Sequence, residues 1–183
     1  QDVAVLKRED EDVDRIKPGE GMAVNLFGRI EGYDISNISG TSQVASMVVF
    51  ESGAPAKAEY RKFKIKTVEG SNDVASMRET LMRRLKHREW RKPDLILIDG
   101  GLPQVHSAEE VLHHLNMLIP VVGMAKGRER KRNDIICSRV SVELCDLCNK
   151  YVDLLASVRD EAHRFAIAYH RKVRSKRFLG GGE

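Results

Sequence analysis

Residues 94–101 read Asp-Leu-Ile-Leu-Ile-Asp-Gly-Gly, with four consecutive large apolar side chains between two acids and a glycine pair at the end. A short, continuous apolar run of this kind is typical of a strand that is covered on both faces, as in the middle of a sheet flanked by helices. The stretch therefore predicts the central strand of an α/β protein, with Asp99 at its carboxyl end.

Helix patterns lie on both sides of this strand. Before it, Asn72 or Asp73 can cap a helix whose apolar residues recur at helical spacing as far as Leu85. After it, residues 104–117 carry their apolar side chains on one side, and a short buried strand follows at 119–124. The alternation of helix and strand predicts that these strands run parallel to the first strand of the chain.

Three further strand patterns precede the first helix. Residues 29–35 alternate and are expected to end near Asp34, residues 44–50 read as a buried strand, and residues 56–66 alternate again. Gly, Ser, Asn and Pro in the links between them are typical of turns. The predicted order is thus β-β-β-α-β-α-β: three antiparallel strands and then α-β-α-β, in a mixed sheet flanked by helices.

The carboxyl-terminal part of the chain is less regular. Residues 126–150 show no clear period and are expected to loop around a pair of strands. Residues 152–174 have a helix pattern, which is expected to break near 158–160. A last helix therefore completes the predicted architecture.

The composition is that of a globular protein. The chain has 183 residues, a length that is sufficient for one domain with its own core, and 42% of the residues are hydrophobic and 32% charged. No apolar run approaches the roughly 18 residues of a membrane span, and the first residues lack a signal-peptide pattern, so we expect a cytoplasmic protein with no membrane contact. The missing initiator Met and the glycine-rich end suggest a fragment of a longer chain.

The three cysteines are expected to be free thiols. Cys137, Cys145 and Cys148 are odd in number, and disulfides are rare in the cytosol. Cys145 and Cys148 form a Cys-x-x-Cys pair, but zinc needs four ligands and no second pair exists. A structural zinc site is the less favoured alternative.

Positive charge is concentrated in three segments, although the net charge is only +4. Residues 57–66, 126–132 and 159–177 contain five, five and seven bases, respectively. If the three segments converge on one face, that face would bind a polyanion; otherwise they are ordinary solvated surfaces.

Two aspartates are candidates for chemistry. Asp34 and Asp99 each end a predicted buried strand, so parallel neighbouring strands would place the two carboxylates side by side. A buried carboxylate pair needs a proton or a cation, and Mg²⁺ or Mn²⁺ suits oxygen ligands. Asp73 can approach the same place. The alternative is that Asp34 caps a turn and Asp99 caps the following helix.

A histidine is the third candidate. His163 lies in the amphipathic pattern of the last helix and shares a helix face with His170, seven residues on. To act as a metal ligand or as a general acid–base, it would need the acids nearby, which spacing alone does not determine.

Four blocks of the sequence resemble the endonuclease half of the UvrC family, the incision subunits of bacterial nucleotide excision repair. The blocks occur in the family's order over about residues 25–177: YDISNISGT at 33–41 with VASMVVF after it, SNDVASMRE at 71–79, LILIDGG at 95–101 with Gln104, and RDEAHRFAI at 159–167 with Tyr169-His170-Arg171. Where the family usually has Lys-Gly before the Gln, this chain has Leu102-Pro103.

The resemblance implies an RNase H-like fold and metal-dependent hydrolysis of a DNA phosphodiester on the 5′ side of a lesion. It implies a catalytic, metal-binding set at Asp34, Asp99 and His163, and a further catalytic aspartate at Asp73. The implied cofactor is Mg²⁺ or Mn²⁺. The implied partners are damaged double-stranded DNA and UvrB, which would bind through parts of the protein outside this chain.

The predicted organisation follows from this resemblance and from the charge pattern. We expect an acidic leader over 1–24, an endonuclease domain over 25–177 and a tail over 178–183. Eight basic side chains are expected to contact DNA: Arg61, Lys62, Lys64, Lys126, Arg164, Arg171, Lys172 and Arg174. Two other functions stay open, a catalytically silent nucleic-acid-binding module on the same fold and another RNase H-like nuclease or recombinase.

Overall fold

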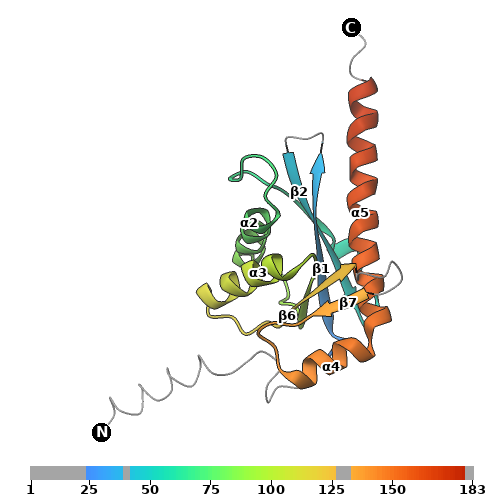
Figure 1. Ribbon diagram of the computed structural model, residues 1–183. Coiled ribbons are helices and arrows are strands. Elements are labelled where there is room, and N and C mark those ends of the chain that lie inside the picture. Colours follow the sequence, from blue (N-terminus) through green and yellow to red (C-terminus); the bar gives the residue numbers. More distant parts are fainter. Residues whose placement is uncertain (1–23, 39–41, 127–132, 180–183) are drawn as a thin grey trace.

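The computed structural model describes residues 24–38, 42–126 and 133–179. The predicted acidic leader, nearly all of the second basic segment and the last four residues of the predicted tail lie outside these ranges. In the described part, one mixed sheet is covered by helices α2 and α3 on one face and by the long helix α5 on the other (Figure 1).

The predicted central strand is at the centre of the sheet. β5 (Leu95–Asp99) pairs in parallel with β1 (Arg29–Ile38) on one side and with β6 (Val121–Lys126) on the other. The outer strands are antiparallel: β2 (Ser42–Glu51) to β1, and β7 (Asn133–Ile136) to β6. The described strands have the order β3-β2-β1-β5-β6-β7, with β4 also on β2, which confirms the predicted α/β class and mixed sheet.

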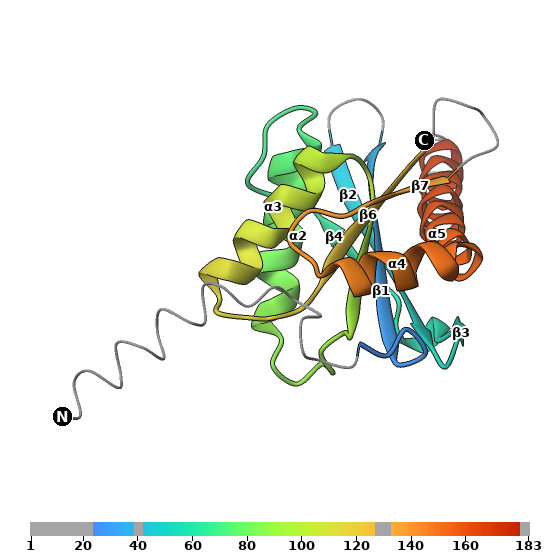
Figure 2. The same ribbon diagram turned by 60° about the horizontal axis from the view of Figure 1, so that its bottom comes forward.

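The helices follow the predicted order, with one addition. α2 (Asp73–Lys86) is capped by Asn72, whose side chain accepts a hydrogen bond from the Ala75 N–H at 3.0 Å. α3 (Leu102–His114) is shorter than expected because Asn116 takes a positive φ, which a helix does not tolerate. The addition is α4 (Val142–Lys150), in the segment expected to be irregular; it crosses in front of the strands in Figure 2.

The last helix runs without a break. α5 spans Val152–Leu179 and passes straight through residues 158–160, where an interruption was expected. The expectation was wrong because Val158 is fully buried on the sheet, so this turn of the helix is held by packing. None of the described helices is both long and apolar enough to span a membrane.

Two predicted strand boundaries were also wrong. β1 continues to Ile38 because its last residues keep pairing with β2, as far as Ile38 opposite Ser42. The predicted strand over 56–66 is divided into a 3₁₀ turn η1 (Lys57–Glu59) and the strand β4 (Arg61–Lys64), and a two-residue strand β3 (Ala54–Pro55) precedes them where a turn was expected. The division arises because the Glu59 and Tyr60 N–H groups bond back to local carbonyls instead of to β2.

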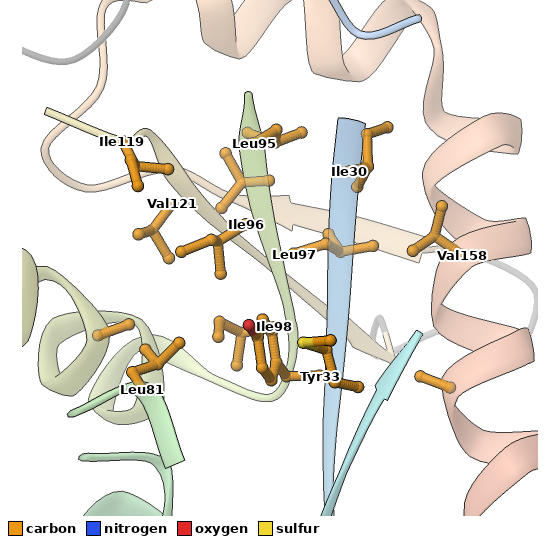
Figure 3. Packing of buried hydrophobic residues seen from close by; sticks show 14 of the residues in the cluster. Ile30, Tyr33, Leu81, Leu95, Ile96, Leu97, Ile98, Ile119, Val121 and Val158 are labelled. Carbon is orange, nitrogen blue, oxygen red and sulfur yellow. The ribbon is translucent and has the colours of Figure 1, made fainter. Parts of the chain in front are cut away.

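The apolar run of β5 forms the middle of the core. Leu95, Ile96, Leu97 and Ile98 are all essentially inaccessible to solvent. Figure 3 shows Val158 of α5 on one side of the strands and Leu81 of α2 on the other, so both faces of the sheet are packed. This two-sided burial is the reason why the run contains no polar residue.

A buried polar network ties β1 to α2. Glu31 is fully buried and accepts hydrogen bonds from the Arg84 guanidinium, at 2.6 Å for the shortest, and from the Tyr33 hydroxyl at 2.7 Å. Arg29, also buried, approaches the same carboxylate at 3.1 Å. Because every charge in this network has a partner, it can lie in the core beside apolar neighbours.

The prediction of three free cysteines was wrong for two of them. Cys137 and Cys145 form a disulfide, with their Cα atoms 6.1 Å apart, and only Cys148 is free. The chain turns from the end of β7 into α4, which brings these two residues together, and the odd number of cysteines does not exclude such a local pair. Burial raises the pKa of the Cys148 thiol to about 12, which disfavours the thiolate that zinc would need.

Candidate active site

The register of the sheet places Asp34 beside Asp99. Gly32 pairs with Leu97 and Tyr33 with Ile98, so the next residues on the two parallel strands lie side by side. Asp99 is the last residue of β5, whereas Asp34 is inside β1 and not at its end. The two carboxylates therefore meet where β5 ends and β1 continues.

Helix α5 brings His163 to the same place. Its Nδ1 atom is 3.8 Å from Oδ2 of Asp34. One ligand atom from each of Asp34, Asp99 and His163 can be chosen so that all three lie within 4.8 Å of one another. The Asp34 side chain is only 10% exposed and that of His163 is 61% exposed, so the group opens to solvent on the side of the helix.

A glycine permits this close approach of α5. A Cβ atom on Gly32 would lie 2.6 Å from Cγ1 of Val158, a distance at which one of them must move. Gly32 and Asp34 are two residues apart on the strand and so face the same side of the sheet. The missing side chain at 32 therefore allows the turn of α5 before His163 to rest on β1.

The electrostatics of the site favour a cation. The pKa of Asp34 is raised to about 6, first by burial and then by the charges of Asp99 and Asp73, while His163 acts in the opposite direction. A carboxylate in this position is costly when it is charged and unpaired. One ligand atom from each of the three side chains could hold a metal ion, and carboxylate oxygens are the ligands that hard divalent cations prefer.

Asp73 lies outside the three-residue group but near enough to affect it. It is the first residue of α2, and its carboxylate accepts a hydrogen bond from Nε2 of Gln43 at 2.8 Å. Gln43 is buried and also accepts from the Asn72 N–H at 3.1 Å. Gln43 thus fixes the start of α2 relative to β2, a role that the sequence did not reveal.

The alternative roles as caps are wrong. The residue that caps α3 is Gly101, whose N–H donates to Oε1 of Gln104 at 3.1 Å, and not Asp99. Asp34 lies within β1 and not in a turn. Leu102 and Pro103, the two residues that differ from the usual family pattern, begin α3 directly after this glycine.

A buried serine next to Asp34 was not predicted. Ser46 pairs with Asp34 across β1 and β2, so both side chains are on the face that α5 covers. Ser46 is fully buried, and its hydroxyl has no hydrogen-bond partner among the described residues. The residue escaped notice because it lies within VASMVVF, which reads as plain core.

The predicted DNA-contacting residues occupy different surroundings. Lys62 and Lys64 alternate with Arg61 on β4, and Arg61 lies against Trp90, 5.0 Å from the ring, on the opposite face of the sheet. Arg164 pairs with Glu161 at 2.6 Å. The remaining three, Arg171, Lys172 and Arg174, are exposed on α5, and the side chain of Lys126 lies outside the described residues.

Known proteins resemble this chain over most of its length. The family described as the UvrC RNAse H endonuclease domain matches residues 22–167. The UvrABC system protein C of Clostridium novyi (strain NT) is 46% identical over 169 residues, which cover 82% of this chain and 27% of that protein. The protein of the same name from Streptococcus thermophilus (strain CNRZ 1066) is 48% identical over 164 residues, covering 86% of this chain and 27% of that protein.

These relatives are much longer than the present chain, which matches about a quarter of their length. Among solved structures, endonuclease V of Ciona intestinalis in complex with a 24mer DNA containing an inosine followed by a ribo-adenosine has a TM-score of 0.45 and 17% identity, over 69% of this chain and 58% of that chain. Because both values are low, this likeness carries no argument about the site.

Proposed function

Because this chain belongs to the UvrC RNase H endonuclease domain family, we propose that it is a metal-dependent DNA endonuclease that acts in excision repair. Its fold is RNase H-like, as the resemblance implied. The observation that carries the proposal is the convergence of Asp34, Asp99 and His163 at the end of the central strand. Asp73 is proposed as an additional acid at the edge of the site.

The proposed chemistry assigns a role to each of these side chains. Asp34 and Asp99 would hold the cation, since their carboxylates face each other across neighbouring strands. Mg²⁺ or Mn²⁺, when bound, supplies positive charge for the phosphate and lowers the pKa of a water molecule. His163, which is exposed on the solvent side, would complete the ligand set or transfer a proton to or from a reacting oxygen.

The proposed substrate is damaged double-stranded DNA, cut on the 5′ side of the lesion in the cytoplasm. Basic side chains on β4 and α5 would contact phosphates, which gives affinity without a preference for base sequence. Such binding suits an enzyme that is directed to its site by a lesion and by a partner. UvrB is the proposed partner, and it would bind parts of the protein outside this chain.

A nicking assay tests the proposal. The 183-residue chain is incubated with lesion-containing and undamaged duplexes in Mn²⁺, in Mg²⁺ and in EDTA. We expect metal-dependent nicking by the wild-type chain, and none detectable for Asp99→Asn, because a carboxamide lacks the charge that holds the cation. Asp146→Asn, an exposed aspartate on α4, is the matched control and should nick normally.

Three results would overturn the proposal: nicking that persists in EDTA, full activity of Asp99→Asn, or no nicking by the wild-type chain. In the last case, DNA binding without nicking would favour the catalytically silent module that the sequence left open.

A further inference from the structure

Lys62 belongs to the same row of side chains as Asp34, although the two residues lie on different strands. Asp34 pairs with Ser46 on β2, and Ser46 pairs with Lys62 on β4. Residues paired across antiparallel strands project from the same face, so all three point toward α5. Strands are spaced about 4.8 Å apart, which places the backbone of Lys62 about 10 Å from that of Asp34.

Two aromatic rings of α5 hold the Lys62 ammonium. Its Nζ atom is 4.1 Å from the ring centroid of Phe165 and 4.0 Å from that of Tyr169. Phe165 itself packs edge-on against Tyr60, with centroids 5.2 Å apart. These cation–π contacts fix the position of the charge, and they come from the same helix that supplies His163.

Among the described residues, no carboxylate contributes to the electrostatic environment of this Lys62 charge. Burial, followed by the charge of Lys172, lowers its pKa, so its surroundings disfavour a bare ammonium. A fixed, half-buried and unpaired cation is stabilised when an anion binds to it.

We propose that Lys62 binds a phosphate of the cut DNA strand within two positions of the scissile phosphate. The inference rests on the proposed function, because the scissile phosphate is taken to lie at Asp34 and Asp99. The strand would then run in the direction from β1 toward β4, along the outer side of α5, because Ser46 between the two positions is buried under this helix. Lys64 differs from Lys62 in being exposed, so it would add charge without marking one position.

The contact can be mapped with duplexes that carry a single uncharged methylphosphonate at each phosphate around the cut. Lys62→Met and Lys64→Met are compared with the wild-type chain in single-turnover nicking and in binding. On the unmodified duplex, Lys62→Met should nick about tenfold to a hundredfold more slowly than the wild-type chain. On the duplex whose methylphosphonate replaces the contacted phosphate, the nicking rate of the wild-type chain should fall to that of Lys62→Met.

Lys64→Met is the matched control, and its nicking rate relative to the wild type should be similar on every duplex. Lys62→Arg keeps the charge at the rings and should retain the position-specific effect, which guards against a simple folding defect in Lys62→Met. The inference is overturned if the loss of Lys62→Met does not depend on the methylphosphonate position, or if the dependence appears farther than two phosphates from the cut.

The two proposals fail in different ways. If the wild-type chain nicks the duplex but Lys62→Met behaves like Lys64→Met, only the Lys62 inference is wrong. If the wild-type chain does not nick, the endonuclease proposal is wrong, and so is the placement of Lys62 beside a scissile phosphate.

Discussion

The Asp34 carboxyl group lies where its charge is unfavourable. It is nearly buried, it adjoins Asp99, and its pKa is raised to about 6. At pH 4 the group is largely protonated in the folded protein, whereas at neutral pH it is largely ionised, and its charge is uncompensated unless a cation binds. A raised carboxyl pKa therefore means that the metal-free protein loses stability as the pH rises from about 4 through about 6.

The substitution Asp34→Asn should remove this pH-dependent loss of stability. In EDTA at pH 7.5 we expect the variant to be more stable than the wild type by about 1 to 3 kcal/mol, with the difference disappearing near pH 4. Thermal melts at both pH values measure the effect. Mn²⁺ should raise the melting temperature of the wild type but not of the variant, and the variant should not nick DNA. A variant that is less stable than the wild type at pH 7.5 would contradict this account.

His163 can be tested against His170 on the same helix. His170 is in contact with Ser36, its Nε2 atom 3.0 Å from the hydroxyl oxygen, and it is not part of the three-residue group. We expect His163→Ala to lose most of the nicking rate but to keep DNA affinity, because phosphate binding depends on Arg and Lys. His170→Ala should lose much less of the rate.

The comparison separates two errors. If His170→Ala is inactive and His163→Ala nicks normally, the proposed active site is assigned to the wrong histidine. If His163→Ala loses binding and nicking in parallel, the residue positions DNA and has no chemical role. Both variants are assayed at one salt concentration.

At this scale, the sequence singled out Asp34, Asp99 and His163 as candidates, and the structure brings ligand atoms of all three together. The sequence did not reveal the polar residues that are hidden among apolar neighbours. Asp34, Asp99 and His163 stand out by residue type and by the family resemblance. Ser46 does not, because a serine within an apolar strand resembles a tolerated core residue. Glu31 was missed for a similar reason, since its partner Arg84 comes from a helix 53 residues away.

At the scale of elements, the approach of α5 to β1 decides the geometry of the site. Gly32→Ala introduces a Cβ atom that collides with Val158 at 2.6 Å and presses on Val48 at 3.1 Å. We expect this variant to be destabilised by about 1 to 3 kcal/mol, as in other overpacked cores. Nicking should fall as well, because α5 carries His163.

A second substitution tests the cause. Val158→Ala removes the atom that the new Cβ would meet, so the double variant Gly32→Ala/Val158→Ala should be more stable than the sum of the two single losses predicts. Urea unfolding of the four proteins measures this coupling. If the two losses of stability simply add, the contact between the new Cβ at position 32 and Val158 is not what destabilises Gly32→Ala.

The sequence predicted the elements with a clear period or a continuous apolar run and missed the short helix α4. The strand β1 and the helices α2, α3 and α5 follow clear periods, whereas β2, β5 and β6 are apolar runs. α4 has only nine residues, of which Leu144 and Cys148 are the buried ones, so its apolar stripe is too short to detect. The usable signal was Ser141, whose side chain accepts a hydrogen bond from the Leu144 N–H at 3.2 Å as an N-cap.

At the scale of the whole molecule, α5 is the longest described element and extends well beyond the sheet in Figure 1. Its exposed bases include Arg171, Lys172 and Arg174, and the charge of Lys172 acts on Lys62 of β4. The first and third basic segments of the sequence thus meet at this helix. The sequence could show the charge of each segment but not their proximity, which depends on how β4 and α5 pack.

This arrangement predicts weak DNA binding that depends strongly on salt. If about five phosphates are neutralised, log K should fall with log salt at a slope near −4 to −5 on duplex DNA, because each contact releases condensed counterions.

The double variant Lys172→Ala/Arg174→Ala should reduce the magnitude of the slope by about 2. Arg78→Ala is the control, since Arg78 is exposed on α2 and already pairs with Glu110. Binding titrations at four or more salt concentrations measure each slope. A wild-type slope near zero would show that the basic runs are only solvated surfaces, and an equal change in the Arg78→Ala control would show that net charge, not the α5 surface, governs binding.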